Sequence, residues 1–226
     1  MSIPSIIQTR AITQLVHFTP FPNLLGVFEC GGVIPRRDLL ERAKALAATG
    51  EQFLLDYIAF NDAARYDNRT DCVNLSIQHP NTALFDSFRH RFPGAIPWFV
   101  LLLDPQLCAD PGVVFTTGNA ASSIVRNEGA GTGEAAFERL FAPSVAAGSF
   151  STGRQTLVRP DALPACLPTN PQAEVLYPGT IPCERILSIA VETEADRRQI
   201  RTALLTEGVD ADALSLALKP ELFKRR

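Results

Sequence analysis

Two short motifs, one near each end of the chain, carry side chains suited to one reaction. His17-Phe18-Thr19 offers a ring nitrogen and a hydroxyl, and Gln172-Ala173-Glu174 offers a carboxamide and a carboxylate. Cleavage of the bond between nicotinamide and ribose in NAD develops positive charge on the sugar, which a nearby carboxylate stabilises. Together the motifs predict the two halves of an NAD-cleaving site, in which Glu174 supplies the carboxylate and Gln172 holds the acceptor.

Apolar runs beside both motifs predict that the motifs lie on strands. Ile12–Val16 leads into the first motif, and Val175–Tyr177 leaves the second. Side chains alternate along a strand, so we expect Gln172 and Glu174 to share one face, and the first and third residues of the other motif to share one. Taken alone, a strand histidine is more often structural and a strand glutamate more often faces solvent. The fold must therefore bring the two motifs together.

The remaining apolar patterns predict the elements that position these motifs. We expect helices at Pro22–Cys30, ended by Gly31-Gly32, and at Arg36–Thr49, Asn81–Phe92, Glu134–Phe141, Ala195–Glu207 and Asp212–Leu218. We expect strands at Cys72–Ile77, Trp98–Leu103, Val113–Thr117 and Arg185–Val191, the second of them central. The segments Ala120–Gly133 and Pro143–Pro171 are expected to be loops. Strands and helices alternate without a regular βαβ order, which indicates an α+β fold.

Composition limits the possible classes of protein. The chain has 226 residues, of which 46% are hydrophobic, and we expect one domain over residues 1–226. Its longest apolar run, Trp98–Leu103, is far shorter than the roughly 20 residues of a membrane span, and no secretory signal is visible. We therefore expect a cytoplasmic protein with no membrane partner. A net charge of −3 excludes a global attraction to nucleic acid, so any such binding must be local.

Several common sites are absent from the sequence. The five cysteines are odd in number and never form a C-x-x-C pair, which predicts free, mostly buried thiols and no zinc site. We expect no metal. The glycine-rich segment Gly129–Gly133 lacks the lysine of a phosphate-binding loop, so a linker is the favoured interpretation. No other standard nucleotide or hydrolase signature occurs.

The chain resembles the DarT family of DNA ADP-ribosyltransferase toxins. The resemblance spans nearly the whole chain and rests on His17-Phe18-Thr19, Asn23-Leu24, Gly31-Gly32, Asp56–Phe60 with Arg65 close behind, and Gln172–Leu176. It implies the ADP-ribosyltransferase fold, in which split β-sheets with flanking helices surround an NAD cleft. It also implies NAD as co-substrate and a base in single-stranded DNA as the acceptor.

Site residues and partners follow from the same resemblance. The resemblance implies that Glu174 is the catalytic glutamate. It implies that Arg65 is the arginine that assists catalysis, with Arg69 as the second choice. Taken alone, either arginine is more often an ion-pair partner. The implied NAD-binding residues are His17, Phe18, Thr19, Asn23 and Gly26. Residues 61–81 depart from the thymine-modifying members at Leu75-Ser76-Ile77 and Pro80-Asn81, which favours guanine. The family also implies a macrodomain antitoxin, similar to DarG, as partner.

Other residues fit a DNA acceptor less specifically. The arginines that could contact phosphates are Arg89, Arg91 and Arg154, although a surface role is more common for each. The aromatic residues that could stack on a base are Tyr66, Trp98 and Phe150, although a core role is more common for each. We expect surface or capping roles for His79 and His90. Two alternatives stay open, namely transfer to RNA, protein or a small molecule, and a catalytically silent nucleic-acid-binding module.

Overall fold

The fold is given by a computed structural model that describes residues 1–49, 67–91, 96–149, 153–206 and 215–225. Its helices are α1 (Ile3–Thr9), α2 (Phe21–Glu29), α3 (Arg36–Thr49), α4 (Thr82–Arg91), α5 (Gly133–Arg139) and α6 (Glu194–Thr206). Its first strands are β1 (Leu15–Pro20), β2 (Gly32–Val33), β3 (Cys72–Ile77), β4 (Trp98–Leu103), β5 (Val114–Thr116) and β6 (Ala130–Thr132). The later strands are β7 (Ser144–Ser149), β8 (Gly153–Val158), β9 (Glu174–Pro178), β10 (Ile181–Pro182), β11 (Ile186–Val191) and β12 (Leu216–Leu218).

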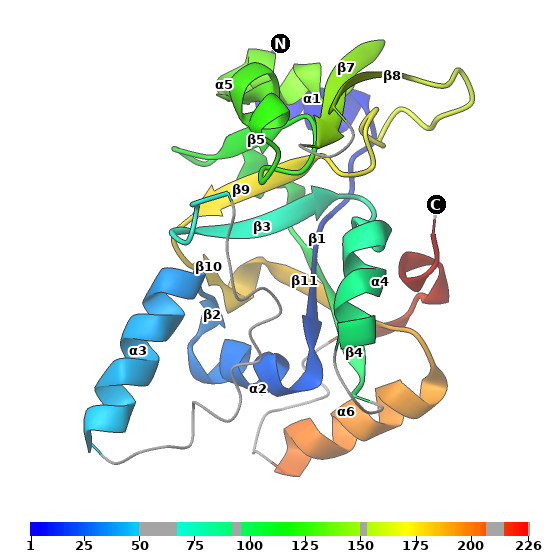
Figure 1. The fold of residues 1–226 in the computed structure, drawn as a ribbon. Coiled ribbons are helices and arrows are strands. Elements are labelled where there is room, and N and C mark those ends of the chain that lie inside the picture. Colours follow the sequence, from blue (N-terminus) through cyan, green and yellow to red (C-terminus); the bar gives the residue numbers. More distant parts are fainter. Residues whose placement is uncertain (50–66, 92–95, 150–152, 207–214, 226) are drawn as a thin grey trace.

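One large sheet organises the molecule. Its eight strands run in the order β12-β11-β4-β1-β3-β9-β5-β6, and β2–β10 and β7–β8 form two small additional sheets. Every residue of β4 is buried between β1 and β11, which confirms that this strand is central. In Figure 1, β3 and β9 run across the view while β1 and β4 run down it. The two halves of the sheet are thus steeply turned against each other.

The junction between β1 and β3 is where the sheet splits. These strands pair only through Leu15 with Ile77 and Val16 with Ser76. Beyond those pairs β1 continues along β4 to Pro20, whereas β3 continues along β9 to Cys72. The sheet therefore divides into a half that carries the His17 motif and a half that carries Glu174, as expected for an α+β fold with split sheets.

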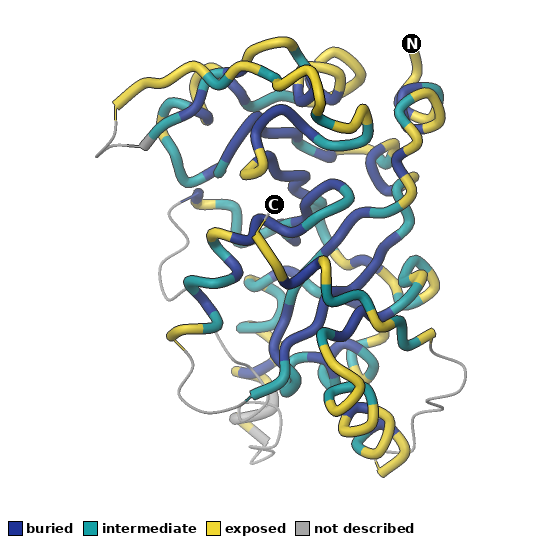
Figure 2. Tube along the Cα trace, turned by 90° about the vertical axis from the view of Figure 1, so that its right-hand side faces the viewer, coloured by how far each residue is buried: buried dark blue, intermediate teal, exposed yellow. Residues whose placement is uncertain are grey.

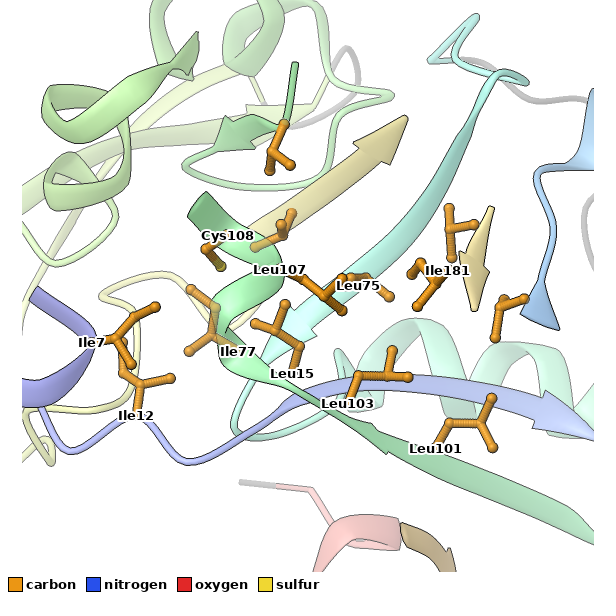
Figure 3. Close-up of a cluster of buried hydrophobic side chains, with 14 of the residues drawn as sticks. Ile7, Ile12, Leu15, Leu75, Ile77, Leu101, Leu103, Leu107, Cys108 and Ile181 are labelled. Carbon is orange, nitrogen blue, oxygen red and sulfur yellow. The ribbon is translucent and has the colours of Figure 1, made fainter. Parts of the chain in front are cut away.

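Apolar side chains cover both faces of β1 by strand alternation. Leu15 belongs to the main core, which also contains Leu24 of α2 and Leu103 of β4. Figure 3 shows part of this cluster, with Leu15, Leu75, Leu101 and Leu103 together, and Figure 2 shows the buried strands inside a more exposed outer layer. Val16 faces the opposite way, into a second cluster with Phe85 and Phe88 of α4.

Local sequence explains the helices next to β1. Pro22 lies in the first turn of α2, where its missing N–H costs nothing, and the helix is followed by Gly31 at a φ of +72°, a left-handed conformation that favours glycine. Asn81 caps α4, because its Oδ1 accepts from the backbone N–H of Leu84 at 3.3 Å. The last turn of α4 is basic, which complements the helix dipole. Phe92, the predicted end of this helix, lies outside the described residues.

Most predicted elements are confirmed, but three segments differ. Pro143–Pro171 contains the hairpin of β7 and β8 rather than one long loop, because backbone pairing holds a ribbon whose outer strand is largely exposed. Ala120–Gly133 contains a short π-helical turn at Val125–Gly129 and the strand β6. In the predicted helix 212–218, residues 216–218 form β12, which pairs in parallel with β11, and residues 212–214 lie outside the described part.

The helix α1 was absent from the sequence prediction. Ser2 caps it, Pro4 lies in its first turn, and Ile3, Ile6 and Ile7 bury one face. These are ordinary start and spacing signals.

The cysteines are free, but only Cys72 and Cys108 are buried, so the expectation of mostly buried thiols is wrong for the other three.

Candidate active site

A cavity of about 400 Å³ lies at the split between β1 and β3. Strands β1 and β3, the first residue of β9, and helices α2, α3 and α4 all contribute to its lining. Among the lining residues are His17, Phe18, Thr19, Asn23 and Glu174. The volume is in the range of small-molecule pockets, roughly 300–1,000 Å³. Both sequence motifs therefore reach one cavity from the two halves of the sheet.

Glu174 is the buried acid of this cavity. It begins β9, lies opposite Thr116 of β5, and is only 5% exposed. Its Oε2 accepts a hydrogen bond from the backbone N–H of Ala120 at 2.9 Å, and its backbone carbonyl accepts from the hydroxyl of Thr116 at 3.4 Å. Hydrogen bonds to backbone hold a side chain in one place, so the carboxylate is pre-positioned toward the cavity that it lines.

His17 and Thr19 come from one face of β1, as predicted. The Nδ1 of His17 lies 2.9 Å from the backbone carbonyl oxygen of Asn74 on β3. A carbonyl oxygen only accepts, so Nδ1 donates, and in the neutral ring Nε2 is then the acceptor nitrogen. Thr19 is 3% exposed, and Phe18 points the other way, stacking on Phe85 with ring centroids 4.6 Å apart.

Two predicted site residues do not lie in the cavity lining of the described structure. Gly26 is on α2 and a Cβ there would have nothing within 4 Å. Gln172 is exposed in a turn before β9, where its N–H donates to the Oδ1 of Asn170 at 2.9 Å. The premise that Gln172 and Glu174 share a strand face is therefore wrong, because the strand begins only at Glu174.

The predicted arginines have different outcomes. Arg65, with the rest of the Asp56–Phe60 block, lies outside the described residues. Arg69 is outside the described lining and pairs with Asp71, Nε to Oδ1, at 3.2 Å. Burial alone would lower the pKa of Arg69, but hydrogen bonds to Asp71 and Cys72 raise it. Arg69 thus forms an ion pair, which the sequence analysis named as the more common role of such an arginine.

The other DNA-contact candidates are mostly engaged within the chain. Arg89 pairs with Glu192, and Arg154 pairs with Glu128 at 2.7 Å. Trp98 is 5% exposed in the cluster with Phe85, so it is a core residue. Tyr66 and Phe150 lie outside the described residues. His79 and His90 contact backbone carbonyls outside the cavity, in keeping with ordinary roles.

Sequence reasoning gave no site role to several polar residues of the lining. They are Arg36, Asp67, Asn74, Asn81 and Asn119; Arg91, which the sequence analysis considered as a phosphate contact, lines the cavity as well. Arg36 is the first residue of α3 and Arg91 the last of α4. The lining thus carries two guanidinium groups, which bind phosphates well, beside the carboxylates of Asp67 and Glu174.

No described helix is long and apolar enough to cross a membrane. Within the same described ranges, no cluster of three or more histidine, cysteine or acidic side chains is arranged to hold a metal ion.

Comparisons with known proteins identify relatives of this arrangement. A family described as "ssDNA thymidine ADP-ribosyltransferase, DarT" matches residues 16–223. Among solved structures, Thermus sp. 2.9 DarT in complex with NAD⁺ is similar with a TM-score of 0.56 at 15% identity, covering 94% of this chain and 98% of that one. The same Thermus protein in complex with ADP-ribosylated ssDNA gives 0.56 at 16% identity, with 95% and 97% covered.

A third structure, Thermosipho africanus DarTG in complex with ADP-ribose, gives a TM-score of 0.54 at 14% identity. The match covers 51% of that chain and 93% of this one. At such identities the structural matches establish a shared fold. A search of curated protein sequences finds no significant match.

Proposed function

This chain belongs to the DarT family of NAD-dependent ADP-ribosyltransferases that act on single-stranded DNA, and from that premise we propose how its own residues carry out the transfer. The cavity at the split sheet is the proposed active site, and Glu174 its catalytic carboxylate. The observation that carries this assignment is the buried Glu174, held by Ala120, in the same cavity as His17 and Thr19 from the other half of the sheet.

The proposed role of Glu174 is electrostatic. When the bond between nicotinamide and ribose breaks, nicotinamide leaves with the bonding electrons and positive charge develops on the ribose. A fixed carboxylate beside that ribose stabilises the charge, and it does so more strongly in a site that excludes water. A base of the acceptor strand then bonds to the ribose carbon and releases its proton.

The residues proposed to hold NAD are His17, Phe18, Thr19 and Asn23. Three observations support them: they line the cavity, His17 and Thr19 offer a ring nitrogen and a hydroxyl to ribose or amide groups, and Thermus sp. 2.9 DarT is a structural relative solved with NAD⁺. Arg36 adds a positive charge suited to the diphosphate. Gly26 and Arg65 stay predictions from the family resemblance, as does Gln172 as an acceptor contact.

The finer proposal concerns the acceptor base. We propose guanine, because the chain departs from the thymine-modifying members at Leu75-Ser76-Ile77 and Pro80-Asn81. Three of these five residues, Leu75, Ser76 and Asn81, line the cavity, which supports a link between the departures and the acceptor. The family description names thymidine, which makes thymine the competing outcome.

We propose a macrodomain antitoxin, similar to DarG, as the protein partner, in line with the toxin–antitoxin character of the family and with the relative named DarTG. An antitoxin that removes the modification is consistent with an enzyme whose substrate is the cell's own DNA. The same substrate is the reason to propose a cytoplasmic location.

The test is transfer from NAD labelled on its adenylate half to synthetic single strands. One oligonucleotide lacks guanine, one lacks thymine, and an RNA copies the sequence of a mixed one. We expect label on DNA that contains guanine and none with Glu174→Ala. The matched control is Glu194→Ala, which makes the same change at an exposed site on α6.

Each outcome of this test decides a separate part of the proposal. Label that needs thymine would replace guanine, and label confined to RNA would replace the substrate. NAD consumption without labelled nucleic acid would point to a protein or small-molecule acceptor. Full transfer by Glu174→Ala would overturn the catalytic assignment.

A further inference from the structure

One wall of the cavity is formed by a single face of α4 and its cap. Its residues follow one another at intervals of three, four and three, which places them on one side of a helix. They are Asn81, Leu84, Phe88 and Arg91, and all four line the cavity. We call this set the α4 wall.

The α4 wall borders the cavity from the side of β1 opposite to α2. Val16 and Phe18 of β1 pack toward Phe85 and Phe88 of α4, whereas Leu15 packs in the cluster that contains Leu24 of α2. Figure 1 shows α4 on one side of β1 and α2 with α3 on the other. Of the proposed NAD residues, only Phe18 points toward α4. The α4 wall therefore forms a second side of the same cavity, opposite the side formed by α2 and α3.

Asn81 contributes an unused hydrogen-bond donor to this wall. Its Oδ1 accepts from the N–H of Leu84 at 3.3 Å, which fixes which end of the carboxamide is oxygen. Its Nδ2 has no hydrogen-bond partner among the described residues, although the residue is only 3% exposed. A buried donor without an acceptor costs free energy, which a ligand acceptor would recover.

Arg91 contributes a cation at the other end of the wall. Its guanidinium carbon lies 5.6 Å from the ring centroid of Phe88, and the side chain is exposed. No carboxylate of the described residues pairs with it, in contrast to Arg89, which pairs with Glu192. An exposed arginine at a cavity edge is suited to a phosphate.

From this arrangement we propose that the α4 wall binds the acceptor nucleotide of single-stranded DNA. The half-buried Leu84 and the edge of Phe88 contact the base, the Nδ2 of Asn81 donates to an acceptor atom on the base edge, and Arg91 contacts a neighbouring phosphate. A nucleotide in a strand combines these three features: an apolar face, hydrogen-bond acceptors and an anion. The inference rests on the proposed function, which supplies DNA as the acceptor.

The variants for the test are chosen to fold. Arg91→Ala removes an exposed side chain, and Asn81→Ser keeps a capping oxygen while losing the amide donor. Arg198→Ala, on the exposed side of α6, removes the same charge away from the cavity. Thermal melting of all four proteins, wild type included, establishes that they are folded to the same extent.

Binding of a fluorescent single-stranded oligonucleotide is then measured by anisotropy over a series of salt concentrations, without NAD. Arg91→Ala should weaken binding roughly tenfold, because a hydrogen-bonded ion pair is lost. It should also lower the slope of log affinity against log salt by about 0.7, the value for one phosphate contact on a single strand. Asn81→Ser should lower kcat/KM for DNA transfer without a change in that slope, and Arg198→Ala should match the wild type.

A parallel titration with NAD, measured by calorimetry, distinguishes this proposal from its rival, in which the α4 wall binds the adenosine half of NAD. The adenosine half of NAD has similar chemistry, so weaker NAD binding by Arg91→Ala and Asn81→Ser with unchanged DNA binding would overturn the proposal. Unchanged DNA binding and transfer in both variants would overturn it as well. Failure of the proposed function is distinct, because the wild type itself would then transfer nothing to DNA.

Discussion

The imidazole of His17 donates through Nδ1 to the backbone carbonyl of Asn74 at 2.9 Å, joining β1 to β3 just beyond the point where the two strands stop pairing. His17, the first residue of the proposed NAD site, thus also links the two halves of the sheet through this hydrogen bond. One side chain therefore affects both the stability of the split and the shape of the cavity inside it.

Replacing His17 should affect stability and NAD binding together. His17→Ala should lower the free energy of unfolding by about 1 kcal/mol, the net value of one hydrogen bond, and should also weaken NAD binding. Urea denaturation and calorimetry measure the two effects. His79→Ala is the control, because that ring contacts the backbone carbonyls of Pro80 and Glu221 and lies outside the cavity. Equal NAD affinity in His17→Ala and wild type would remove His17 from the site.

Shortening the carboxylate at position 174 should separate its charge from its position. Glu174→Asp keeps the charge but withdraws the carboxylate from the place where Ala120 holds it. A displacement of about 1 Å at a reacting centre costs on the order of 10²-fold in rate, so transfer should fall by that factor while NAD affinity stays near the wild-type value. Single-turnover transfer with labelled NAD measures the rate. A rate near wild type would mean that any nearby charge suffices.

Local patterns predicted the half of the site that lies in strands, but not its α4 side. Apolar runs beside His17 and Glu174 predicted strands, and the structure has β1 and β9 at these places. Asn81 was predicted as a helix start and Arg91 as a possible phosphate contact, but no local pattern places them in this cavity, because that depends on where β1 and β3 part. That separation is a property of the whole sheet.

The missed elements have a similar physical cause. β8 is largely exposed and is held by backbone pairing with β7, so it lacks the apolar alternation that predicts a strand. The short segment Leu216–Leu218 is apolar enough for either helix or strand, and pairing with β11 decides the outcome. Gln172 illustrates the reverse error, in which the predicted strand was extended by two residues into a turn.

Gly32 should tolerate no side chain. A Cβ there would lie 2.3 Å from the backbone oxygen of Ile181, where β2 pairs with β10. Backbone cannot move aside as a flexible side chain can, so Gly32→Ala should destabilise the protein by about 1–3 kcal/mol. Thermal unfolding measures the change, and Gly26→Ala is the control because its Cβ would meet nothing within 4 Å. Comparable melting of both variants would contradict the close approach.

Cysteine reactivity should follow burial. Burial raises the pKa of the Cys108 thiol, with smaller contributions from Asp110 and Asp104, and the side chain is 1% exposed. The thiolate is the reactive form, so Cys108 should resist iodoacetamide in the folded protein even as the pH rises from neutral to mildly alkaline. Cys30 and Cys183 are half-buried and should react faster over the same range, as read by peptide mass spectrometry. Unfolding in urea should abolish the difference, and early modification of folded Cys108 would contradict the packing.

Arg36 should act on NAD rather than on DNA. It is the first residue of α3 and lines the cavity on the α2 side of β1, across from Arg91. Arg36→Ala should weaken NAD binding roughly tenfold, because a guanidinium bound to a phosphate contributes a charge-assisted hydrogen bond. Its neighbour Arg37 pairs with Asp38 at 3.0 Å, outside the described lining, so Arg37→Ala is the matched control. The expected result is the mirror image of Arg91→Ala, with NAD affinity lost and oligonucleotide affinity kept. If Arg36→Ala instead weakened oligonucleotide binding and left NAD binding intact, the assignment of the two sides of β1 would be reversed.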